Sequence, residues 1–426
     1  MTSVSGFAAN KFVLQQNLEA ENRVQEQRIQ VSTGKKSQTF DGISDNVRRL
    51  EGLESDFAAN EAFQRNVDRT ELRLQEMESS VSTLNDTASR FRTQLLSAAN
   101  DGGNLESIDL GKIASTFRDE VVGQLNTEVG GRFLFSGSAT NTTPIDLTSA
   151  SGFSDIKNGA YFKGNGEELT ARVTQSTTLD YGISAEPGKG KGFQKLMTAL
   201  SRVIENPESP DAVEKSLRDL SGGEAQAVVS FDSVKNPSAA LNASENFGSG
   251  LSFSAPPPAA EEFSITIGGS TTDLTSAPTS IAEGDSLIDI AGKIENNVSG
   301  VEAQVGGKND TPRLEVFTTN GAPVSFTTNF SGGGTQPRQQ TDVQIDGAIN
   351  ELADTRSEIG SSRGLLESTK TQLENTQTRL EGNISDVEDV NLTRAMTLLA
   401  QNQTTLQSSF AVTARLSQVS LLNFLR

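Results

Sequence analysis

The stretch that decides the fold is residues 345–387, which read IDGAINELADTRSEIGSSRGLLESTKTQLENTQTRLEGNISDV. An apolar residue occupies every seventh position, and no proline interrupts the run. These positions are Ile345, Leu352, Ile359, Leu366, Leu373, Leu380 and Val387. A strict heptad repeat of this length predicts a long helix that supercoils against a partner helix.

A second apolar pattern, between residues 67 and 95, offers that partner within the same chain. Its positions alternate three and four residues apart: Val67, Thr70, Leu74, Met77, Val81, Leu84, Ala88, Phe91 and Leu95. This helix begins near Val47, and the sequence Asn100-Asp101-Gly102-Gly103 predicts its end and a turn. We therefore expect the two heptad segments to pair as an intramolecular coiled coil.

The remaining parts of both chain ends also favour helix. Residues 110–125 form a third amphipathic segment, and Arg132–Gly137 is typical of a short strand. Residues 1–40 are weakly amphipathic, with a break at 32–36. After a predicted break at 385–389, a last helix runs from Leu392 to the end of the sequence.

Residues 138–342 differ from both ends, because Ser, Thr, Gly, Asn and Pro are frequent there. Alternating apolar residues predict strands at 263–267 and 313–317, and helical spacing predicts helices at 193–205 and 287–297. The fold class is therefore a mainly α, long-helix coiled-coil rod formed by both chain ends, with a β-rich α+β insertion of two subdomains. The predicted segments are an N-terminal assembly arm (1–40), two halves of the helical rod (41–137 and 343–389), the insertion (138–342) and a C-terminal assembly arm (390–426).

Composition excludes several classes of function. The formal net charge of −19 argues against binding to nucleic acids or anionic membranes, and no apolar run is long enough to insert into a membrane. The sequence has no Cys and no His, so we expect no enzyme, no catalytic or metal-binding residues and no cofactor. Residues 188–192, Gly-Lys-Gly-Lys-Gly, lack the spacing of a phosphate-binding loop and favour a flexible turn. The N-terminus shows no cleaved secretory signal.

The two arms are the candidate assembly segments. Their apolar rows are too sparse to fold alone, so we expect them to become ordered against neighbouring subunits. The alternative is that the two arms only pair with each other. The candidate assembly residues in the arms are Leu14, Leu18, Leu399, Leu406, Phe410, Leu421, Leu422, Phe424 and Leu425.

Arg356 and Arg363 stand one heptad apart and give the long helix a cationic face. One interpretation is a charged lateral contact to another subunit, which makes both arginines candidate assembly residues. The alternative is a solvated face, or ion pairs within the chain to acidic residues such as Glu71, Glu76 and Glu78.

Six short segments resemble five recurring motifs of one family, in the family's order. Residues 30–36 and 41–45 are similar to "LSSGKR…PSDDP", 64–68 to "QYQRNID", 131–137 to "GRYLFSG", 385–390 to "SxIEDVD" and 416–425 to "LSLLNYL". The chain thus resembles the bacterial flagellins, and more closely the flagellar hook-filament junction proteins, over about its first 140 and last 85 residues.

This resemblance implies a structural subunit of the flagellum, located outside the cell. Such subunits are exported unfolded by the flagellar export apparatus with an export chaperone and without signal cleavage. They assemble with themselves, as a ring or helical tube, and with hook-associated protein and flagellin. A filament-forming flagellin and a non-flagellar coiled-coil surface protein or adhesin are the alternatives.

Overall fold

The computed structural model describes residues 2–37, 46–100, 109–148, 150, 152–230, 262–274, 276, 279, 281, 285–308, 311–318, 321–329 and 338–424. They form two compact units, one of Met1–Arg65 with Lys370–Arg426 and one of Asn66–Thr369. The helices described are α1 (Thr2–Thr33), α2 (Val47–Asn100), α3 (Leu110–Leu125), α4 (Phe153–Lys157), α5 (Phe193–Glu205), α6 (Pro210–Ser221), α8 (Leu287–Asn297), α9 (Ala348–Glu388) and α10 (Leu392–Phe424). The strands are β1 (Thr170–Arg172), β2 (Thr178–Asp180), β3 (Gly222–Ser230), β4 (Glu262–Ile267), β5 (Ser270–Asp273), β6 (Val301–Lys308), β7 (Thr311–Thr318), β8 (Val324–Asn329) and β9 (Arg338–Asp346).

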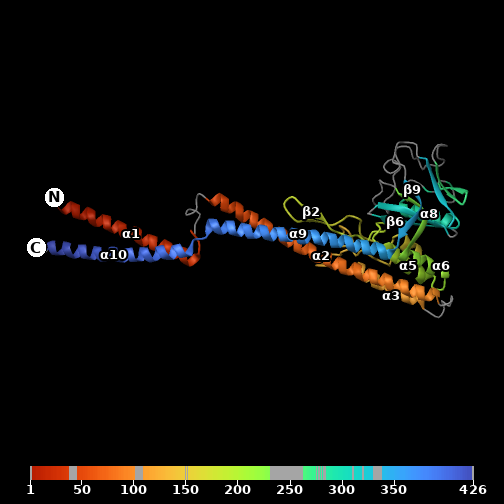
Figure 1. The fold of residues 1–426 in the computed structure, drawn as a ribbon, viewed down its shortest axis with the longest axis horizontal. Coiled ribbons are helices and arrows are strands. Elements are labelled where there is room, and N and C mark those ends of the chain that lie inside the picture. Colours follow the sequence, from red (N-terminus) through yellow and green to blue (C-terminus); the bar gives the residue numbers. More distant parts are fainter. Residues whose placement is uncertain are drawn as a thin grey trace. The chain divides into compact units, whose positions relative to one another are not determined.

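In the first unit, α1 and α10 lie side by side and run antiparallel (Figure 1). The start of α2 packs against the end of α9 in the same unit. There the Asn60 amide donates to the carbonyl of Leu373 at 3.0 Å and to Gln377 Oε1 at 2.7 Å. The first unit therefore joins both ends of the chain through helix pairs.

In the second unit, α2 and α9 also pair antiparallel. The Asn85 amide donates to the Ile349 carbonyl at 2.8 Å, and further along Arg363 Nη1 lies 2.5 Å from Glu78. Every position of the 67–95 pattern is at most 4% exposed, and Leu352, Ile359 and Leu366 are buried as well. The long helices of both chain ends and the β-rich middle confirm the predicted fold class. The predicted limits of the five segments stay predictions.

Three details of the sequence-based expectation are wrong. Ile345 is not in a helix, because it pairs with Gly223 as part of β9, and α9 begins only after Gly347 approaches Gly222. Residues 132–137 do not form a strand, and their β-pairing is limited to an isolated bridge between Phe133 and Glu128. The predicted break at 385–389 is shorter, since α9 continues to Glu388 and α10 starts at Leu392.

The described part of the β-rich middle contains the antiparallel β1–β2 hairpin and two larger antiparallel sheets, in the orders β6-β7-β3-β9 and β5-β4-β8. Strand β3 lies between β7 and β9, so the chain enters and leaves this region through paired strands. Helix α8 packs mainly on β6 and begins at a capping box formed by Ser286 and Asp289. One apolar core is built from α8 and residues of both sheets. Strand β9, which pairs with β3, leads through Gly347 directly into α9 and connects this region to the long helix.

The glycine-rich segment 188–192 is a turn, as predicted. Gly188, Gly190 and Gly192 all have positive φ, and Gly192 caps the N-terminus of α5. A Cβ atom on Gly190 would come within 2.2 Å of the Gly307 carbonyl oxygen. The glycines therefore permit a close backbone approach at this turn.

Candidate assembly interface

The seam between α1 and α10 is narrow and largely polar. The Asn17 side chain is 5% exposed and donates to Thr413 Oγ1 at 3.1 Å, and Ser409 Oγ donates to its oxygen. Asn402 donates to Gln27 Oε1 at 2.9 Å. Polar seam residues of this kind set the register of paired helices at a cost in stability. The seam also holds small or partly buried apolar residues, namely Ala20, Val24, Ala395, Leu399 and Leu406.

Large apolar side chains lie on the outside of this helix pair. On α1, Phe12, Leu14, Leu18 and Ile29 are 40–64% exposed. On α10, the exposed side chains are Leu392, Met396, Leu398, Phe410 and Val412. Contiguous exposed apolar surface is typical of interaction sites, whereas single scattered apolar side chains are ordinary. We refer to these nine side chains as the outer apolar set.

The structure separates the predicted assembly residues into groups. Leu14, Leu18 and Phe410 belong to the outer apolar set, at 59%, 53% and 50% exposure. Leu399 and Leu406 are half-buried on the seam between the two arms. The side chains of Leu421, Leu422, Phe424 and Leu425 lie outside the described part of the chain.

Sequence reasoning missed the other six members of the outer apolar set. Met396 lies fourteen residues, or two heptads, before Phe410, so the spacing could have identified it. Leu392 stands seven residues before Leu399, and Leu398 and Val412 stand fourteen residues apart, so spacing points to these three as well. Phe12 and Ile29 share no such spacing, and only the structure reveals their exposure.

A clasp of backbone and side-chain hydrogen bonds joins the end of α1 to the α9–α10 connection. Lys36 N donates to the Glu388 carbonyl at 2.7 Å, and Val390 N donates to the Gly34 carbonyl at 2.8 Å. The Lys35 ammonium pairs with the Glu388 carboxylate, and this hydrogen bond raises the pKa of Lys35. The clasp brings together the two sequence segments 30–36 and 385–390.

Arg356 and Arg363 converge on one carboxylate of their own chain. Arg356 Nε lies 3.6 Å from Glu78 Oε1, and Arg363 Nη1 lies 2.5 Å from Glu78 Oε2. Glu78 is one of the acidic residues expected as partners if the two arginines form ion pairs within the chain. Their use as lateral contacts between subunits stays a prediction.

Two buried ionic clusters hold the helices of the second unit to its larger sheet. Arg202 lies 2.5 Å from Asp219 and 2.7 Å from Glu302, which also contacts Arg218. Burial raises the pKa of the Glu302 carboxyl, but Arg202 and Arg218 outweigh it and hold the value at about 2. In the second cluster Lys195 lies 2.6 Å from Glu351. Both clusters hold secondary-structure elements of the second unit together. The cavities that members of the two clusters border among the described residues are too small for a substrate.

The described residues contain neither a candidate membrane span nor a candidate metal site. No helix in this part of the chain is both long and apolar enough to cross a membrane. No group of three or more His, Cys, Asp or Glu in the same residues has a geometry that could hold a metal ion.

Comparison with known proteins gives one family match. Residues 343–425 match the family model of the bacterial flagellin C-terminal helical region. None of the curated proteins compared with the chain matches it.

Several solved flagellar structures share a distant likeness with the chain. A protein described as a flagellar hook-associated protein from Vibrio parahaemolyticus is 22% identical, with 43% of this chain and 81% of that chain covered and a TM-score of 0.35. The flagellar junction protein FlgL from Legionella pneumophila is 12% identical, with 87% and 98% covered and a TM-score of 0.27. FlgL from Xanthomonas campestris is 16% identical, with 84% and 99% covered and a TM-score of 0.28.

The family match covers the whole of α9 and of α10, the two helices that meet at the clasp. It confirms the resemblance to flagellins over the C-terminal end of the chain and supports the predicted structural role in the bacterial flagellum. Residues 343–425 of this chain are therefore similar to the C-terminal helical region of the bacterial flagellins.

Proposed function

We propose that the chain is a structural subunit of the bacterial flagellum that assembles through α1 and α10, and that it forms the junction between hook and filament. The observation that carries this proposal is the outer apolar set on the paired arms. A monomer leaves these side chains in water, whereas contact with other copies of the arms buries them. The role at the junction rests on the resemblance of residues 131–137 to junction proteins.

The contact proposed for the arms joins different surfaces of neighbouring copies. A surface that contacts a different surface on the next copy gives rings or helical tubes, and not closed dimers. We propose that the partners along the axis are a hook-associated protein on one side and flagellin on the other.

The decisive experiment adds purified protein to isolated flagellar hooks and measures the length added by electron microscopy. A junction subunit should add a short segment of constant length, whatever the protein concentration. Continued elongation would refute the junction and favour a filament flagellin, the alternative that the match to the flagellin C-terminal region supports. Failure to bind hooks or to self-associate would refute both.

We also propose export in an unfolded state, with a dedicated chaperone, to the outside of the cell. The polar seam supports this, since few large apolar groups are buried among the described side chains of α1 and α10. Comparing secretion in strains with and without an active flagellar export apparatus tests this proposal. Equal amounts of protein in the medium of both strains would contradict it.

A further inference from the structure

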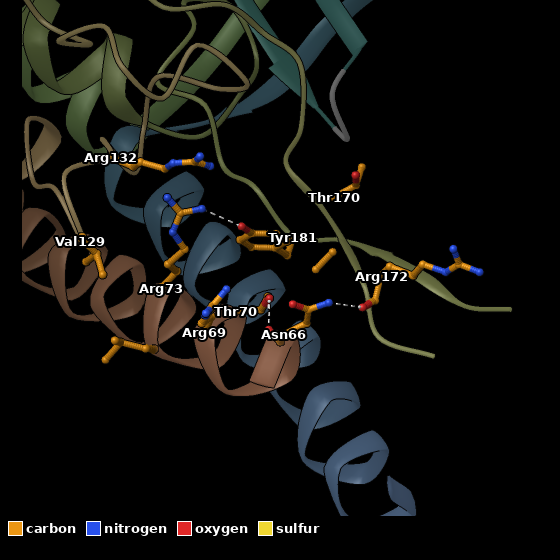
Figure 2. Close-up of a pocket in the computed structure, with 12 residues that line it drawn as sticks. Asn66, Arg69, Thr70, Arg73, Val129, Arg132, Thr170, Arg172 and Tyr181 are labelled. Atoms are coloured by element: carbon orange, nitrogen blue, oxygen red, sulfur yellow. Dashed lines mark hydrogen bonds between the residues drawn. The ribbon is translucent and has the colours of Figure 1, made fainter. Parts of the chain in front are cut away.

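The second unit contains an open pocket of about 620 Å³ on the side of α2 (Figure 2). Its walls come from three places in the sequence: α2 from Asn66 to Arg73, the loop 129–132, and the β1–β2 hairpin with Tyr181. Asn66 fixes the hairpin to α2, because its amide donates to the Arg172 carbonyl at 3.4 Å. Neither the arms nor the clasp takes part in this pocket.

The pocket is strongly basic in a chain that is strongly acidic. Arg69, Arg73, Arg132 and Arg172 line it, and no acidic residue is among the described residues of its wall. Elsewhere in this unit, arginines meet carboxylates, as Arg202 does with Asp219. With a formal net charge of −19, four arginines around one acid-free hollow are an exception to the chain's charge pattern.

Three of the four guanidinium groups are available to a ligand. Arg172 is engaged by its own hairpin, where it donates to the Thr174 carbonyl at 3.3 Å, and Figure 2 shows it pointing away from the pocket. Arg73 is held in place by its hydrogen bond to Tyr181 Oη at 3.0 Å. Arg69 and Arg132 are exposed and form no ion pair within the part of the chain that the structure describes.

The arrangement suits carboxylates carried on a peptide. A guanidinium binds a carboxylate through two parallel hydrogen bonds, and three of them offer room for more than one carboxylate. In Figure 2, Arg73 and Arg132 extend into the same part of the pocket. Leu72, which is 50% exposed, and Val129 add apolar contact at the wall. Clusters of arginine are a recurring means of recognising acidic segments.

We propose that this pocket binds an acidic segment of a second copy of this chain, with its carboxylates between Arg69, Arg73 and Arg132. Charge complementarity favours this occupant, because every copy carries 55 acidic residues against 36 basic ones. The contact is heterologous, so it can repeat from one subunit to the next. It rests on the self-assembly proposed above and gives the second unit a lateral contact that is separate from the arms.

The first test reverses two exposed charges. The double variant Arg69→Glu/Arg132→Glu should raise the concentration needed for self-association by at least about tenfold at low salt. The matched control is Arg65→Glu, one turn earlier on α2, because Arg65 is exposed and outside the pocket. Circular dichroism must show the wild-type helix content, and Arg69→Gln/Arg132→Gln replaces the double variant if it does not fold. Equal association of variant, control and wild type overturns the proposal.

The second test identifies the occupant. A photo-crosslinking amino acid at Leu72 in the full chain, mixed with isotope-labelled copies, should give a product between two copies within an acid-rich peptide. Crosslinks to a neutral or basic peptide, or none between copies under conditions of assembly, overturn the proposal. Salt provides a third readout, since wild-type association should weaken from 50 to 300 mM NaCl more than that of the double variant.

The outcomes also separate this inference from the proposed function. If the wild-type chain does not self-associate, both fail. If it does, and arm variants weaken association while pocket variants do not, only the pocket inference fails.

Discussion

Replacing Leu14 and Leu18 with glutamine should weaken self-assembly without destabilising the monomer. The two side chains lie one helical turn apart on α1 and are 59% and 53% exposed in the isolated chain. Their exposed fractions together amount to about one whole leucine, whose burial contributes roughly 1.5–3 kcal/mol. If assembly buries them fully, the critical concentration should rise about 10- to 150-fold, at tenfold per 1.4 kcal/mol.

The assay is sedimentation of assembled protein over a series of total concentrations, with thermal unfolding of the monomer measured in parallel. Because both leucines are already exposed, the free energy of unfolding should change by less than about 0.5 kcal/mol. Leu365→Gln is the matched control, since Leu365 is 52% exposed on α9 outside the arms. An unchanged critical concentration for the arm variant, or an equal rise for the control, would refute the reasoning.

Three further outcomes are expected for the folding of the two units. Met77→Ala removes a fully buried side chain on α2 and should lower the free energy of unfolding by about 2–5 kcal/mol, measured by urea denaturation; a loss below 1 kcal/mol would contradict the buried position. The pKa of Glu302 is about 2 in the folded chain, against an ordinary value of 4.5. The ionised Glu302 carboxylate therefore stabilises the folded protein above pH 4.5, and this contribution is lost as the pH falls through 2. It amounts to about 3 kcal/mol, so Glu302→Gln should be less stable than wild type at pH 7 and lose less stability between pH 4.5 and 2; parallel pH profiles would argue against this assignment. Gly34→Ala should destabilise the first unit by about 1–2 kcal/mol, because Gly34 ends α1 with φ of +74°. Its counterpart Gly360→Ala, inside α9 with open space around it, should instead stabilise by about 0.5–1 kcal/mol, and circular dichroism melts compare the two.

Much of the helical framework could be predicted from local sequence. The pattern from Val67 to Leu95 gave the buried face of α2, and the ranges expected at 110–125, 193–205 and 287–297 coincide with α3, α5 and α8. Periodicity of 3.6 residues and capping residues act within a few turns, so a single segment carries the information. The strands at 263–267 and 313–317 also lie within β4 and β7.

Pairing across long distances in the chain could not be predicted in this way. Ile345 continues the heptad repeat, yet it lies in a strand because β9 pairs with β3, more than a hundred residues earlier in the sequence. Helix α6 and the order of both sheets were not anticipated. Strand pairing depends on which distant segments meet, and that is decided by the packing of the whole unit.

The sequence by itself determined that this protein has long helices at both ends, a β-rich middle and sparse apolar rows in its arms. Only the tertiary structure decided which side of each arm faces inward. Hydrogen bonds of Asn17 and Asn402 set the seam, and this choice leaves Leu14, Leu18 and Phe410 in solvent. The basic pocket has the same origin, because its arginines lie in separate segments of the sequence and meet only when the hairpin and the 129–132 loop pack against α2.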